Sequence, residues 1–109
     1  MKLRILASAK VDLEEGSRFY EAQSAGLGDY FITSVGADIE SLRLYAGTHP
    51  VAYKGFHRSL CRIFPFAIYY LISPDAATIY AIVDCRRDPA WIRRRLRKSG
   101  EPPPTTKNA

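Results

Sequence analysis

The sequence predicts an α+β domain in which a small antiparallel β-sheet is covered on one face by an α-helical hairpin, in the order β-α-α-β-β-β-α. Two segments in the N-terminal half repeat apolar residues every three or four positions, as helices do. Three later segments are strand-like apolar runs separated by short turns. A chain of 109 residues has the size of one domain. We therefore expect a single domain over residues 1–99 and a disordered, proline-rich tail over residues 100–109.

The composition is that of a globular protein, with 47% hydrophobic and 25% charged residues. The apolar run over residues 66–72 is too short to cross a bilayer, so we expect a cytoplasmic protein with no membrane partner. Cys61 and Cys85 have no metal-ligand spacing with either histidine, and we expect reduced thiols, no metal and no cofactor. The net charge is +5, from 16 lysines and arginines against 11 aspartates and glutamates.

The N-terminal half predicts a strand over residues 2–7, followed by helices over about residues 10–23 and 28–45. The two helical stripes consist of Ala9, Leu13, Gly16 and Tyr20, and then of Leu27, Phe31, Val35, Ile39 and Leu42. The break between them is short, so the helices should lie antiparallel as a hairpin. Gly16 and Gly36 each cost about 1 kcal/mol relative to alanine within a helix. They either permit close helix contact or are simply tolerated.

The C-terminal half predicts three strands, over residues 57–63, 66–72 and 78–85, and then a helix over residues 89–98. Short turns join the strands, which indicates an antiparallel meander. The middle strand is apolar on both faces and should be central. Asp88 is suited to cap the last helix.

Counting with a period of two assigns the side chains of the strands to the two faces of the sheet. We expect one set beneath the helical hairpin: Ile79, Ala81, Val83, Cys61 and Ile63. A second set should line the other face, which stays open unless a partner or the last helix lies on it: Arg58, Arg62, Tyr80, Asp84 and Arg86. Such a basic and aromatic face suits phosphates or an acidic helix. The alternative is a solvated charged face without a ligand.

Two basic clusters allow both a functional and a structural interpretation. Within residues 84–88, Arg86 and Arg87 either hold a phosphate or carboxylate bidentately or pair with nearby acidic groups. The run over residues 93–98 either solvates the end of its helix or contacts an acidic partner or nucleic acid.

Four motifs occur in order along the chain: Ala9…Asp12-Leu13-Glu14-Glu15…Phe19-Tyr20-Glu21, Gly26-Leu27-Gly28…Phe31, Arg58…Phe64-Pro65-Phe66-Ala67-Ile68-Tyr69-Tyr70, and Val83-Asp84-Cys85-Arg86-Arg87-Asp88-Pro89. This set resembles the RelE/ParE toxin superfamily, and above all its ParE-like plasmid-stabilisation members, over about residues 3–96. The resemblance implies a bacterial type II toxin that a small cognate antitoxin inactivates in a hetero-oligomer, through an acidic C-terminal segment. ParE-type members are associated with inhibition of DNA gyrase, and RelE-type members with cleavage of mRNA on the ribosome.

The residues bear on the choice between these two activities. Phosphodiester cleavage needs a proton acceptor, charge stabilisation and a proton donor. A nuclease would draw on Arg58, Arg62, Asp84, Arg86 and Arg87, with Asp84 or a tyrosine as the proton acceptor. Many relatives have histidine just before the Cys85 position, whereas this chain has Asp84, whose pKa should be lowered by Arg86. This difference favours a toxin that acts by binding gyrase, without chemistry of its own.

Residues proposed for antitoxin or target binding are Arg58, Arg62, Tyr80, Arg86, Arg87, Trp91 and Arg94. Three hypotheses remain open at this point: a gyrase-binding toxin, a ribosome-dependent endoribonuclease, and a degenerate toxin that only binds its antitoxin. In each of them, charge reversal at Arg62 is expected to weaken the antitoxin complex.

Overall fold

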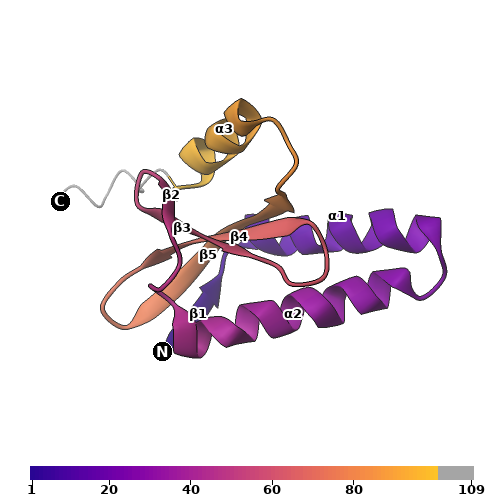
Figure 1. Ribbon diagram of the computed structural model, residues 1–109, viewed down its shortest axis with the longest axis horizontal. Helices are drawn as coiled ribbons and strands as arrows, with labels where there is room; N and C mark the ends of the chain where they lie inside the picture. Colours follow the sequence, from indigo (N-terminus) through magenta and orange to yellow (C-terminus); the bar gives the residue numbers. More distant parts are fainter. Residues whose placement is uncertain (101–109) are drawn as a thin grey trace.

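The computed structural model describes residues 1–100, and their side chains through residue 98 (Figure 1). The elements are β1 (Lys2–Ile5), α1 (Ala7–Gln23), α2 (Leu27–Tyr45), β2 (Val51–Tyr53), β3 (Phe56–Leu60), β4 (Phe66–Ile72), β5 (Ala76–Asp84) and α3 (Pro89–Gly100). The predicted tail falls almost entirely on residues 101–109, which lie outside the described residues. None of the described helices is long and apolar enough to cross a membrane.

The strands form a five-stranded sheet in the order β1-β5-β4-β3-β2. The antiparallel meander of β3, β4 and β5 is confirmed, with β4 in the middle. Two details differ from the prediction. β2 lies between the second predicted helix and the strand predicted from residue 57, where no strand was predicted, because a three-residue edge strand is too short to show a period. β1 joins β5 in parallel, so the sheet is mixed, since a strand that leads into helices is not held antiparallel by a tight turn.

The helical hairpin of α1 and α2 covers one face of the sheet, as predicted (Figure 1). The α2 stripe is buried as Phe31, Val35, Ile39 and Leu42, and the α1 stripe supplies Ala9 and Gly16. Except at Gly16, which has no side chain, these residues pack on Ile68, Tyr70 and Ile79 of the sheet. Fully burying one such large apolar side chain contributes about 1.5–3 kcal/mol to stability.

The other face, which would be open without a partner or the last helix, is covered by α3 (Figure 1). Asp88 caps this helix as predicted, since its Oδ1 accepts a hydrogen bond from the Ala90 N–H at 3.3 Å. Ile92 and Leu96 are buried against Phe56 and Tyr69 of the sheet. The domain therefore has two hydrophobic clusters, one on each face of the sheet.

A β-bulge in β5 overturns part of the predicted face assignment. Tyr70 pairs with Ile79 and Tyr69 with Ala81, which leaves Tyr80 as the extra residue. Ile79 lies under the hairpin as predicted. Beyond the bulge the alternation is reversed, because one additional residue moves every later side chain to the opposite face. Ala81 and Val83 therefore face α3, and Ile82 lies under the hairpin.

The predicted face assignment is also partly wrong for the residues that follow β3. Cys61 packs against the hairpin cluster as predicted, and burial raises its pKa to about 12. Ile63 is half exposed, and Phe64 fills the core instead. The reason is that β3 ends at Leu60, so the alternation of a strand no longer applies beyond that residue.

The two helical glycines have different structural roles. A Cβ atom at Gly16 would lie 2.6 Å from Cζ of Phe31, whereas one at Gly36 would meet nothing within 4 Å. The Phe31 ring is fully buried and is in contact with the rings of Tyr20, Phe64 and Phe66. It has no room to move away.

We expect Gly16→Ala to lower the free energy of unfolding by about 1–3 kcal/mol, the usual cost of overpacking a core. Gly36→Ala, the matched control, should instead raise it by up to about 1 kcal/mol, because alanine is the better helix former. Urea unfolding followed by circular dichroism measures both changes. A Gly16→Ala protein as stable as the wild type would contradict the close contact.

Candidate functional site

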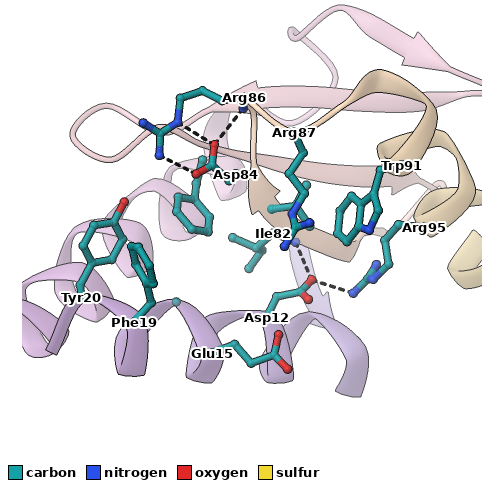
Figure 2. Close-up of a pocket in the computed structure, with 13 residues that line it drawn as sticks. Asp12, Glu15, Phe19, Tyr20, Ile82, Asp84, Arg86, Arg87, Trp91 and Arg95 are labelled. Atoms are coloured by element: carbon teal, nitrogen blue, oxygen red, sulfur yellow. Dashed lines mark hydrogen bonds and ion pairs between the residues drawn. The ribbon is translucent and has the colours of Figure 1, made fainter. Parts of the chain in front are cut away.

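A groove with a volume of about 490 Å³ opens at the C-terminal end of β5 (Figure 2). One wall is α1, the other is the turn after β5 with the start of α3, and the end of β5 forms the floor. We call it the α1–α3 groove. It lies where two helices that cover opposite faces of the sheet come close together, and a cleft of this kind is the candidate functional site.

Asp84 and Arg86 form a bidentate ion pair at the rim of the groove (Figure 2). Nε and Nη2 of Arg86 donate to the two carboxylate oxygens at 2.9 and 2.6 Å, and the backbone N–H of Arg86 donates at 2.8 Å. The guanidinium lowers the pKa of Asp84, and the carboxylate raises the pKa of Arg86. Both groups are therefore charged at neutral pH. Arg86 pairs with a nearby acidic group, which is the structural one of the two interpretations given for residues 84–88.

Arg87 is held differently, by an aromatic ring. Its Cζ lies 4.0 Å from the centroid of the Trp91 ring, a cation–π contact. Among the described residues, no carboxylate forms an ion pair with Arg87. Stacking orders a guanidinium and leaves the N–H groups at its edge able to donate. Arg87 is thus positioned to bind an anionic group bidentately.

The wall formed by α1 is aromatic. Phe19 is 57% exposed, and its ring meets that of Tyr20 edge to face with centroids 5.1 Å apart. Figure 2 shows both rings on the α1 side, across the groove from Arg87 and Trp91. Burial raises the pKa of Tyr20, with a further contribution from Asp84, so its hydroxyl stays protonated at neutral pH. The groove therefore presents an apolar wall opposite a cationic one.

A buried ion pair links the two walls at the inner end of the groove. Nη2 of Arg95 lies 2.7 Å from Oδ2 of Asp12, and the two side chains are 18% and 13% exposed. The same oxygen accepts the Ile82 N–H at 2.9 Å, so α1, β5 and α3 meet at one carboxylate (Figure 2). Burial raises the pKa of Asp12, while the hydrogen bond from Ile82 and the charge of Arg95 oppose this shift.

The groove unites four of the residues predicted from the sequence: Asp84, Arg86, Arg87 and Trp91. It also uses Asp12, Phe19, Tyr20 and Arg95, which the sequence analysis did not propose as site residues. Three of these belong to the first motif of the resemblance, which is the signal that could have identified them. Their meeting with β5 and α3 is a tertiary contact that no local pattern shows.

The expectation that five residues share one open face is wrong, because α3 covers that face and the bulge reverses the alternation in β5. Tyr80 packs edge to face on Phe56, with ring centroids 5.2 Å apart. Arg58 and Arg94 are exposed outside the groove, on β3 and α3.

Arg62 lies at a second cleft, between α2 and β3, with a volume of about 360 Å³. Its Nε is 3.7 Å from Oδ1 of Asp38 on α2, and its side chain is 80% exposed. His49 lines the same cleft, and its Nδ1 is hydrogen bonded to the Tyr70 hydroxyl. In the described part of the chain, no three His, Cys, Asp or Glu residues are grouped so as to hold a metal ion.

Comparisons with known proteins agree with this architecture. No protein-family model and no curated protein sequence matches the chain. Among solved structures, a chain of the "Chromosomal ParDE TA system from P. aeruginosa" matches with a TM-score of 0.67 and 16% sequence identity. The match covers 77% of this chain and 95% of that one. At this level of identity it is the fold that is shared, and the chain therefore has a ParE/RelE-like toxin fold.

Proposed function

We propose that this protein is the toxin of a bacterial type II toxin–antitoxin system, that a cognate antitoxin neutralises it, and that it acts by binding DNA gyrase. The shared fold and the α1–α3 groove support this proposal. The single observation that carries it is the stacking of Arg87 on Trp91 opposite the exposed ring of Phe19. This pairing of a cation with an apolar wall suits a protein segment that is both acidic and apolar.

The antitoxin segment is expected to place a carboxylate on Arg87 and an apolar side chain against Phe19. A bidentate contact between arginine and a carboxylate adds geometric specificity to charge attraction. Arg86 is already paired with Asp84 and therefore contributes less to a new anion. Trp91 acts by holding the Arg87 guanidinium, and its ring gains further burial when the groove is filled.

The charge states in the groove support binding rather than catalysis. A general base works best with a pKa near the operating pH. The pKa of Asp84 is lowered by its ion pair, which makes this carboxylate a weak proton acceptor. The pKa of Tyr20 is raised, which makes its phenol hard to deprotonate. The two candidate acceptors are thus both shifted away from neutrality, in opposite directions.

The alternative is a ribosome-dependent endoribonuclease, and one observation favours it. Arg86, Arg87 and the protonated Tyr20 line the same groove, and together they could stabilise charge and donate a proton. Primer extension on translated mRNA after induction tests this alternative. New 3′ ends at ribosomal A-sites would establish the ribonuclease and overturn the gyrase proposal. A chain that causes no growth arrest without its antitoxin would instead be a degenerate toxin.

In a supercoiling assay, the purified protein should inhibit gyrase in a concentration-dependent way. Trp91→Ala should raise the half-inhibitory concentration by about tenfold or more, since buried aromatic anchors dominate interfaces. Tyr45→Ala, at an exposed tyrosine outside the groove, is the matched control and should inhibit like the wild type. Unchanged supercoiling at saturating wild-type protein would refute the gyrase target.

The antitoxin complex is tested with the product of the short acidic reading frame expected beside this gene. Arg87→Glu should weaken that complex by about tenfold or more, because reversal places like charges in contact. Arg62→Glu changes the net charge equally at the α2–β3 cleft and is expected to have a smaller effect. Calorimetric titration measures both affinities. If only Arg62→Glu weakens the complex, the antitoxin binds at the α2–β3 cleft instead.

A further inference from the structure

The outward side of α3 is a basic surface that the α1–α3 groove does not use. Apart from Pro89 at its start, the exposed residues of this helix through residue 98 are all basic. Lys54 in the turn between β2 and β3, and Arg58 on β3, add to them on the same side of the sheet. We call this set the basic face: Lys54, Arg58, Arg93, Arg94, Arg97 and Lys98.

Contacts at one tyrosine join the two parts of the basic face. Nη1 of Arg97 donates to the Tyr53 hydroxyl at 3.4 Å, and Nζ of Lys54 lies 5.8 Å from the centroid of the same ring. Tyr53 itself packs against the cluster beneath α3. Arg58 follows the buried Phe56 by two residues and so points to the α3 side of its strand. The fold thus collects cations from distant segments into one surface.

The charge of the basic face is not neutralised within the described part of the chain. The ion pairs found there engage Arg43, Arg62, Arg86 and Arg95. None of these four belongs to the basic face. Crowding six cations is unfavourable where no carboxylate pairs with them, because like charges repel, and no such pair is found among residues 1–98. A polyanionic partner would remove that repulsion.

Lys54 occupies a backbone conformation that is rare for its residue type. Its φ is +44°, and Gly55 follows with a φ of +84°. These two residues connect the paired Tyr53 and Phe56, as in a two-residue hairpin turn. Such turns favour Asn, Asp or Gly, which accept a positive φ more readily than lysine does. A lysine there is less favourable for the turn and adds a cation to the basic face.

We propose that the basic face docks on the phosphate backbone of duplex DNA. Arg93 and Arg97, like Arg94 and Lys98, are four residues apart and form two cationic rows along the helix. Protein interfaces have an apolar or aromatic centre, which the outward side of α3 lacks. Single strands are bound by exposed aromatic platforms, and Tyr53 and Trp91 are both partly buried. The choice of DNA over RNA rests on the proposed function, because gyrase acts on DNA.

Fluorescence anisotropy with the full chain and a labelled duplex of mixed sequence, about 20 base pairs long, tests the proposal over a series of salt concentrations. Four or more neutralised phosphates predict a loss of about a hundredfold in affinity between about 50 and 200 mM salt. Arg94→Glu/Arg97→Glu should weaken binding by about tenfold or more at the lower salt and make the salt dependence shallower.

The matched control is Lys10→Glu/Arg18→Glu, which changes the net charge equally at exposed positions of α1. This control should bind DNA within about threefold of the wild type. Equal weakening of DNA binding by both double variants would show that the affinity depends on overall charge and not on the basic face, and would overturn the proposal. Tighter binding to an RNA duplex or a single strand of the same length would overturn it too, as would the absence of wild-type binding at low salt.

A second variant separates binding from folding. Lys54→Asn should raise the midpoint of thermal unfolding, because asparagine is favoured in this turn, and should weaken DNA binding severalfold. Unchanged or tighter DNA binding by Lys54→Asn would show that Lys54 does not contribute to DNA binding and would count against the proposal. The binding assay contains no gyrase, so the two proposals can fail separately. DNA binding without inhibition of supercoiling refutes only the proposed function. Inhibition of supercoiling without DNA binding refutes only the proposal that the basic face binds DNA.

Discussion

The largely buried ion pair between Asp12 and Arg95 is the interaction on which the α1–α3 groove depends. One carboxylate joins the first helix, the last helix and the backbone of β5 through the Ile82 N–H. Removing one partner of a fully buried pair costs about 3–5 kcal/mol, and the cost is lower here because side chains that are 18% and 13% exposed stay partly hydrated. The pair also bridges α1 and α3 at the inner end of the groove. The burial of Ile92 and Leu96 then determines which side of α3 faces outward.

The position of α3 gives this short helix three separate roles. Its inward residues, Ile92 and Leu96, complete the second hydrophobic cluster. Its first turn contributes Trp91, which orders Arg87 at the groove. Its outward residues are basic and exposed. Because these roles lie on different sides of one helix, the proposed antitoxin segment and the proposed DNA duplex would bind on distinct surfaces, and substitutions can separate the two proposals.

Local patterns in the sequence predicted most of the fold. Apolar spacing identified the helical hairpin, and the apolar run over residues 66–72 identified the central strand. The errors began where a local period breaks down. A bulge at Tyr80 reverses the alternation in β5, and its position depends on pairing with β4, which a single strand does not reveal. The direction of β1 likewise follows from hydrogen bonds to the distant β5, and the existence of the short β2 follows from its pairing with the neighbouring β3.

The residues of the candidate site were likewise predicted only where a local pattern brings them together. Residues that are neighbours in the chain, such as Asp84, Arg86 and Arg87, were predicted together, because proximity in sequence ensures proximity in space. The partners across the groove were not, since Asp12 and Arg95 are 83 residues apart. By itself the sequence determined the helices, the meander and the chemical types available. Only the tertiary structure decided which face α3 covers and which charges meet, because burial and long-range pairing are properties of the packed chain.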